Sequence, residues 1–200
     1  MRTLVYGGAA CGKSALAELL CHAGAASVQR ATDAQGSARA QGPATPLVYI
    51  ATMEPLGPEA ATRITRHRSQ RAAAGFLTFE RPRDLGALVI PTGAHVLFEG
   101  LGTLVANELY APPDYALRPA DEALARVMDG VSHLEDVAVD LTVVSDDVFA
   151  DGVTYPEQTR TYLDVLARAN ALLAQRFERV VEVVCGLPIW HKGEEGERPR

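Results

Sequence analysis

Residues 3–20 read TLVYGGAACGKSALAELL, and this stretch decides the fold. The β-branched and aromatic run Thr3–Tyr6 predicts a short buried strand. Residues 7–14 read GGAACGKS and match the pattern G-x-x-x-x-G-K-[ST] without a mismatch. Strong helix formers follow in residues 15–20. A strand, a glycine-rich loop and a helix therefore occur in the order that a phosphate-binding loop requires.

The composition of this loop suits the binding of a nucleoside triphosphate. Glycines let successive backbone N–H groups converge on phosphate oxygens, and the start of the following helix adds partial positive charge. Lys13 is expected to reach the outer phosphates, and the Ser14 hydroxyl to ligate Mg²⁺. The predicted nucleotide-binding residues of the loop are Gly7, Gly8, Ala9, Ala10, Cys11, Gly12, Lys13 and Ser14. The alternative is a chance match in a glycine turn, which the strand before and the helix after make improbable.

Bulk composition limits the classes of function. The 200 residues suit one α/β domain, and the net charge of −6 without a basic stripe argues against a nucleic-acid binder. The three cysteines are widely spaced and show no metal-binding pattern, and no secretory segment is evident. No apolar run approaches the roughly 20 residues that span a bilayer. We therefore expect a cytoplasmic protein with no membrane span.

Strands alternate with helices along the rest of the chain, which predicts a doubly wound, mostly parallel α/β sheet with helices on both faces. We expect one domain over residues 1–193, with a flexible insertion at about 24–46 and a charged tail at 194–200. The expected strands are 47–52, 77–80, 95–99, 140–145 and 180–184. The expected helices are 58–74, one opening at 81–85, 101–110, 120–137 and 156–177.

The predicted helix 58–74 is unusually cationic for an acidic protein. Arg63, His67 and Arg71 lie four residues apart and therefore share one stripe of the helix. Such a stripe is either a solvated face or a phosphate-binding face, and composition alone favours the solvated face.

Carboxylates follow two of the predicted strands. Glu99 ends the strand 95–99, where a carboxylate near the phosphate loop would hold Mg²⁺ or its water, although it could also be a surface residue that ends the strand. Asp146 and Asp147 follow the strand 140–145. These two aspartates could bind metal or a substrate hydroxyl, or they could cap the loop.

With these residues assembled, the chain resembles the bifunctional adenosylcobinamide kinase/adenosylcobinamide-phosphate guanylyltransferase family of cobalamin biosynthesis. The resemblance is collinear through VYGGAACGKSALAE, VYIATM, RITRHRSQR, LFEGLGTLVANEL, the segment from VVSDDVF to ANALLA, and VVEVVCGLPIWHKG. The R-I-x-x-H-x-x-x-R helix after a Y-I-A-T strand is its most diagnostic part. The resemblance implies a P-loop NTPase fold of the RecA-like kind.

The family's residue roles transfer to matching positions. His67 matches the histidine that becomes guanylylated, so the resemblance implies a catalytic role for His67 beside Lys13. Further nucleotide-binding residues implied in this way are Ala51, Thr52, Met53, Arg68, Ser69, Gln70, Arg71, Glu80 and Glu99. Glu80 matches only if one residue is inserted between Arg71 and Glu80. Asp146–Asp147 stand where the family commonly has Asn-Glu, and Gly100–Leu101 where it often has a cysteine and polar residues.

The resemblance implies ATP or GTP and adenosylcobinamide, a corrinoid, as substrates, Mg²⁺ as cofactor, and a homotrimer with sites shared between subunits. Two alternatives remain open on the residues alone. One is another small-molecule P-loop kinase, in which His67 belongs to a phosphate-binding face. The other is a catalytically idle nucleotide-binding relative.

Overall fold

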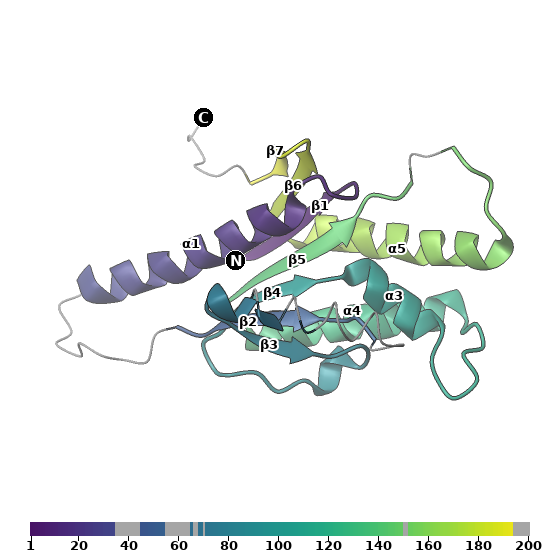
Figure 1. The fold of residues 1–200 in the computed structure, drawn as a ribbon, viewed down its shortest axis with the longest axis horizontal. Coiled ribbons are helices and arrows are strands. Elements are labelled where there is room, and N and C mark those ends of the chain that lie inside the picture. Colours follow the sequence, from purple (N-terminus) through teal and green to yellow (C-terminus); the bar gives the residue numbers. More distant parts are fainter. Residues whose placement is uncertain (35–44, 55–64, 66–67, 70, 150–151, 194–200) are drawn as a thin grey trace.

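A computed structural model describes residues 1–34, 45–54, 65, 68–69, 71–149 and 152–193. Within these residues, the strands form a seven-stranded sheet in the order β3-β2-β4-β5-β1-β6-β7 (Figure 1). All neighbouring pairs are parallel except β6 and β7, which are antiparallel. The strands are β1 Arg2–Gly7, β2 Leu47–Ala51, β3 Phe76–Glu80, β4 His95–Glu99, β5 Asp140–Asp146, β6 Arg179–Val184 and β7 Leu187–Lys192.

Helices cover both faces of this sheet. On one face, Ala17, Leu20 and Cys21 of α1 pack against apolar side chains of β1, β2 and β4. On the other face, α3, α4 and α5 bury a larger apolar cluster with the same strands. The helices are α1 Lys13–Ala34, α3 Leu101–Leu109, α4 Ala120–Val137 and α5 Glu157–Arg176, with a short 3-10 helix, η1, at Leu85–Ala87. The predicted doubly wound α/β sheet is therefore confirmed.

The sheet topology places the predicted polar residues at one edge. The carboxyl ends of parallel strands meet at the same edge, so the residues that follow β1, β2, β4 and β5 converge there. Strand β5 lies between β1, which leads into the glycine-rich loop, and β4, which ends at Glu99. A strand between these two is the arrangement of a RecA-like P-loop NTPase, as expected.

The start of the predicted insertion, residue 24, was placed too early in the sequence. Helix α1 continues to Ala34, because the alanine-rich residues 23–34 favour a helix even without apolar periodicity. Gly24 lies inside this helix and not at its end. A Cβ at Gly24 would lie 2.9 Å from Asp140 Oδ2 and 3.3 Å from His95 Nδ1, so glycine allows the helix to pass close to the sheet.

Two further expectations need revision. The helix predicted to open at 81–85 is the single 3-10 turn η1, and Pro82 and an αL conformation at Asp84 (φ 52°) precede it. Strand β7 was not anticipated, because residues 187–192 lack the alternation of a half-buried strand and are mostly exposed. Within the predicted helix 58–74, residues 65, 68–69 and 71–73 are helical, and Ala74 is in a turn. Residues 58–64, 66–67 and 70 lie outside the described residues.

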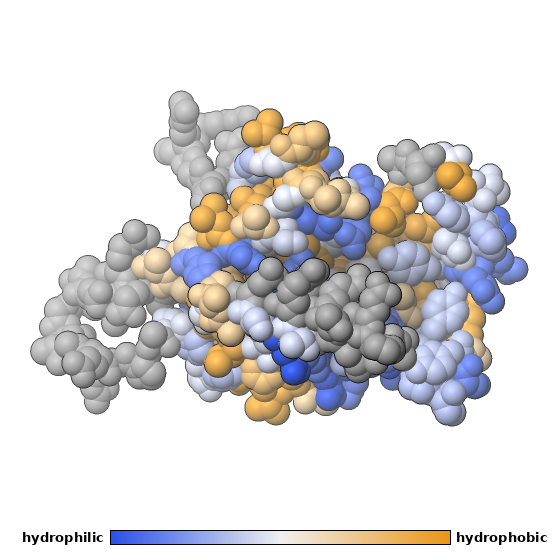
Figure 2. All heavy atoms as spheres, viewed as in Figure 1, coloured by the Kyte–Doolittle hydropathy of each residue, from blue (hydrophilic) through white to orange (hydrophobic). Residues whose placement is uncertain are grey.

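On the face seen in Figure 2, apolar and polar side chains are interspersed, and apolar side chains gather at the top over the β6–β7 hairpin. Val184, Leu187 and Ile189 are the exposed apolar residues there.

Among the described helices, none combines the length and the apolar character needed to cross a membrane. The single domain over residues 1–193 stays a prediction, and the tail 194–200 lies outside the described residues.

Candidate active site

The glycine-rich loop connects the end of β1 to the start of α1 at Lys13. Gly7 has no room for a side chain, because a Cβ there would lie 2.6 Å from the Val183 carbonyl oxygen. Gly12 adopts a φ of 98°, which favours glycine. The Cys11 carbonyl accepts a hydrogen bond of 2.8 Å from the Gly186 N–H, so the turn between β6 and β7 supports the loop. The loop therefore has the geometry of a phosphate-binding site at a helix N-terminus.

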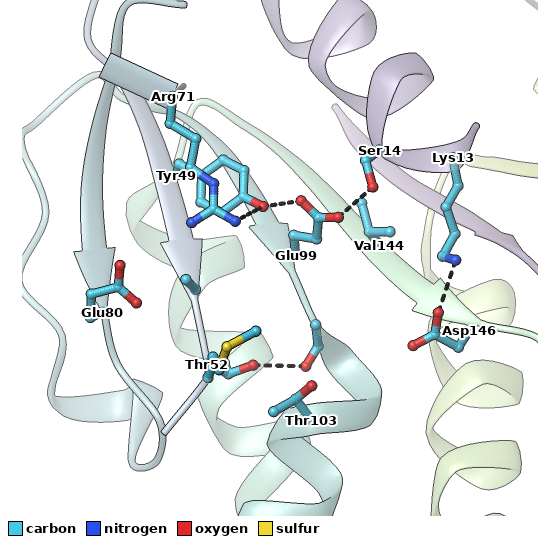
Figure 3. Close-up of a pocket in the computed structure, with 13 residues that line it drawn as sticks. Lys13, Ser14, Tyr49, Thr52, Arg71, Glu80, Glu99, Thr103, Val144 and Asp146 are labelled. Atoms are coloured by element: carbon cyan, nitrogen blue, oxygen red, sulfur yellow. Dashed lines mark hydrogen bonds and ion pairs between the residues drawn. The ribbon is translucent and has the colours of Figure 1, made fainter. Parts of the chain in front are cut away.

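The Lys13 ammonium group lies over this loop. Its Nζ donates to the Gly8 carbonyl oxygen at 3.0 Å and lies 2.9 Å from Asp146 Oδ1 (Figure 3). Only 12% of the Lys13 side chain is exposed, against 42% for Asp146. The structure thus separates the paired aspartates. Asp146 faces the phosphate loop, whereas Asp147 Oδ1 accepts a hydrogen bond from the Phe149 N–H at 3.3 Å, as a loop cap does.

A chain of side-chain contacts joins the phosphate loop to residue 71. The Ser14 hydroxyl and the Tyr49 hydroxyl each donate to one oxygen of Glu99, and Arg71 Nη2 donates to the Tyr49 hydroxyl at 2.6 Å. The Arg71 guanidinium carbon also lies 3.5 Å from the centroid of the Tyr49 ring. Because arginine can only donate, the Tyr49 proton must point toward Glu99. Both Glu99 oxygens are therefore occupied by hydroxyl donors.

Burial is the largest cause of the pKa shifts of Glu99 and Arg71, the two charged residues at the ends of the Glu99–Tyr49–Arg71 contacts. It raises the pKa of the Glu99 carboxyl above its ordinary value, and the hydrogen bond from Ser14 and the charge of Lys13 act in the opposite direction. Burial also lowers the pKa of Arg71, against the charges of Glu80 and Glu18. Arginine remains cationic in proteins, so Arg71 presents a partly desolvated positive charge to the pocket.

Eight of the eighteen sequence-predicted site residues line one pocket, and residues 7–12 of the loop are not among them. The eight are Lys13, Ser14, Ala51, Thr52, Met53, Arg71, Glu80 and Glu99. Arg68 lies outside the lining and forms an ion pair with Glu80 at 3.2 Å, and the Ser69 hydroxyl donates to the Thr65 carbonyl within the helix. His67 and Gln70 lie outside the described residues.

Sequence reasoning missed several residues of this pocket, above all Tyr49. Tyr49 is fully buried and was assigned only to the predicted strand. The available signal was a tyrosine within an apolar strand, because a buried tyrosine hydroxyl usually has a partner. Gly100, Thr103 and Val144 also line the pocket, as does Asp146, which the sequence had offered as a ligand of metal or of a substrate hydroxyl. A Cβ on Gly100 would lie 2.7 Å from Thr52 Oγ1, so this glycine lets the ends of β2 and β4 approach closely.

The donor set fits Mg²⁺. Ser14 and Glu99 place a hydroxyl and a carboxylate in contact beside the phosphate loop, and Mg²⁺ prefers such oxygen ligands, completing its shell with waters and substrate phosphates. No group of three or more His, Cys, Asp or Glu suited to a metal ion occurs among the described residues.

The loop, the sheet order and the acidic end of β4 define a P-loop NTPase. Within this class, a family model described as "Cobinamide kinase / cobinamide phosphate guanyltransferase" matches residues 3–190, and the chain belongs to this family. It is 30% identical over 197 residues to the "Bifunctional adenosylcobalamin biosynthesis protein CobP" of Pseudomonas aeruginosa PAO1, covering 97% of this chain and 99% of that protein.

The chain is also 27% identical over 199 residues to the "Bifunctional adenosylcobalamin biosynthesis protein CobU" of Escherichia coli K12, covering 94% and 98% of the two chains. Among solved structures, an ATPase domain superposes with a TM-score of 0.45 and 8% identity, covering 90% of this chain and 68% of that chain.

Proposed function

We propose that this protein phosphorylates the hydroxyl group of adenosylcobinamide and then transfers GMP from GTP to the resulting adenosylcobinamide-phosphate. The observation that carries the proposal is the family match over residues 3–190 together with an intact phosphate loop. Phosphoryl transfer depends on positioning and charge stabilisation, for which Lys13 and the loop N–H groups are suited. Mg²⁺ held beside Ser14 and Glu99 would neutralise phosphate charge, and ATP or GTP would supply the phosphoryl group.

For the second reaction, the proposed nucleophile is His67. Attack of its imidazole on the α-phosphorus of GTP would form a phosphoramidate and release diphosphate, after which the acceptor phosphate displaces the histidine. The proposal is supported by the motif RITRHRSQR and by Arg71, which brings a cation of this segment into the pocket. Cations there would bind the triphosphate and stabilise the charge that develops during transfer.

The proposal extends to a homotrimer in the cytoplasm. The exposed apolar residues Val184, Leu187 and Ile189 on the β6–β7 hairpin support a subunit contact, because isolated exposed apolar groups are common but grouped ones mark interfaces. Sedimentation of the purified protein tests the trimer directly.

The decisive experiment follows the covalent adduct. Wild type and His67→Ala are incubated with α-labelled GTP and Mg²⁺, denatured, and analysed for protein-bound label. Wild type is expected to retain label that is lost in acid and stable in alkali, and His67→Ala none. His191→Ala, which removes an exposed histidine on β7, serves as the control and should label as wild type does. Label on the His67→Ala protein would refute the nucleophile.

The two activities should separate in the same variant. His67→Ala should still transfer the γ-phosphoryl group of labelled ATP or GTP to adenosylcobinamide, because that step uses no enzyme nucleophile. Loss of both activities in a protein that still binds nucleotide would instead indicate that the kinase reaction also depends on His67.

A further inference from the structure

A hollow of about 570 Å³ lies beside the phosphate loop, separate from the lining of the pocket described above. It is bounded by Gly8 of the loop, by the residues after β5 and by the first turns of α5. Its volume is within the range of small-molecule sites. Its lining includes Gly8, Asp147, Tyr155, Thr159, Tyr162 and Leu163.

Asp146 directly precedes Asp147, which lines this hollow, and itself lines the first pocket beside the phosphate loop. Its Oδ1 lies 2.9 Å from the Lys13 ammonium on the loop side. Its Oδ2 points toward Gly102, where an added Cβ would lie 3.4 Å from Asp146 Oδ2 and 2.9 Å from the Tyr162 hydroxyl. The Tyr162 hydroxyl, in a residue that lines the hollow, and the Asp146 carboxylate therefore approach the same point. Tyr162 lines the hollow and Asp146 lines the first pocket, so this pair of side chains lies where the two cavities approach each other.

The charges that line the hollow favour a neutral ligand over an anionic one. Its described lining contains no lysine or arginine, and Asp147 contributes a carboxylate. A phosphate or carboxylate ligand would be repelled there. Aromatic and aliphatic groups with hydroxyl donors suit a neutral alcohol carried on a larger organic molecule.

We infer that this hollow receives the hydroxyl end of the phosphoryl acceptor and that Asp146 is the base that accepts the hydroxyl proton. The inference rests on the proposed kinase function and assigns its acceptor site. Nucleotide phosphates that bind to Lys13 displace its contact with Asp146 and leave the carboxylate free at the side from which the acceptor arrives. The acceptor phosphate of the second reaction is anionic and would instead bind near Arg71.

The step balances as an in-line displacement. The acceptor oxygen forms a bond to the γ-phosphorus, and the bond from this phosphorus to the β,γ-bridging oxygen breaks, with its electron pair leaving on the nucleoside diphosphate. The proton of the acceptor hydroxyl passes to Asp146. Burial, and then the charge of Asp146, raises the pKa of Tyr162, so its hydroxyl stays neutral and can orient the acceptor oxygen.

The first test is Asp146→Asn, which keeps the shape and removes the base. Transfer of label from γ-labelled ATP to adenosylcobinamide should fall by about 100-fold or more, the usual contribution of a general base. Affinity for a non-hydrolysable triphosphate should be unchanged or tighter, since Lys13 loses an internal anion. Asp164→Asn, an exposed aspartate of α5 paired with Arg168, is the matched control and should keep full activity.

The guanylylation readout distinguishes the possible failures. Asp146→Asn should still form the protein-bound adduct from α-labelled GTP. If wild type does not phosphorylate adenosylcobinamide, the proposed function fails and this inference with it. If wild type does so and Asp146→Asn retains that activity, only the base is refuted. Loss of triphosphate binding in Asp146→Asn would also overturn the assignment, because the residue would then serve nucleotide binding.

A second variant tests the hollow itself. Thr159→Trp places a large side chain in the hollow at the start of α5. The KM for adenosylcobinamide should rise at least tenfold while the affinity for the triphosphate is unchanged. An unchanged KM in a folded Thr159→Trp protein would show that the acceptor binds elsewhere.

Discussion

Substitution of Tyr49 by phenylalanine tests the chain of contacts that joins Arg71 to the phosphate loop. The change removes the hydroxyl that accepts from Arg71 and donates to Glu99, and it keeps the ring on which the guanidinium lies. Hydrogen bonds to charged groups contribute more than neutral ones, and a buried carboxylate oxygen would lose its donor. We expect the free energy of unfolding to fall by about 2 kcal/mol.

The assay is urea unfolding at pH 7, supported by thermal melting. For a chain of this length, the loss corresponds to a decrease in Tm of about 6 °C. Tyr110→Phe is the matched control, because among the described residues the Tyr110 hydroxyl makes one exposed hydrogen bond, at 3.5 Å to the Gln158 carbonyl. That variant should stay within about 0.5 kcal/mol of wild type. A double-mutant cycle with Glu99→Gln should give a coupling energy of about 1 kcal/mol. Equal stability of the two tyrosine variants would refute the reasoning.

Two further predictions concern the loop and the cysteines. Lys13→Ala should reduce both adenosylcobinamide phosphorylation and GMP transfer by on the order of 100-fold or more while the far-UV circular dichroism stays unchanged, because in our proposal this cation stabilises phosphate charge in both reactions. Near wild-type rates for either reaction would contradict a single phosphate loop. Burial, with the nearby charge of Asp140, raises the pKa of Cys21 to about 12, so this thiol should resist iodoacetamide at pH 8 while the exposed Cys185 is alkylated. Peptide mapping by mass spectrometry would contradict this if Cys21 were modified as fast as Cys185.

Local patterns predicted the phosphate loop and the sheet well. The glycine-rich motif has fixed spacing between a strand and a helix, so Lys13 and Ser14 could be placed from that spacing alone. Glu99 could be placed near the loop because parallel strands end at a common edge, and in the structure its carboxylate accepts a hydrogen bond from Ser14. The functions of these residues stay predictions.

Tertiary packing decided what the sequence could not predict. Gly24 suggested a break, but it lies where α1 crosses Asp140 and His95. Nothing near Tyr49 in the sequence indicates that its hydroxyl meets Arg71 and Glu99, because the three residues come from separate segments. The two aspartates after β5 were equivalent in the sequence, and only the fold directs Asp146 to Lys13 and Asp147 to its own loop.

The contact between Lys13 and Asp146 affects which anions can bind to the phosphate loop. Before nucleotide arrives, a carboxylate 2.9 Å away already balances the ammonium charge. A small anion such as inorganic phosphate or sulfate must compete with this carboxylate, and it gains only part of the Coulomb attraction of a free lysine. A triphosphate spans several N–H groups of the loop at once and can outweigh the competitor. We therefore expect this loop to bind simple anions more weakly than nucleoside triphosphates.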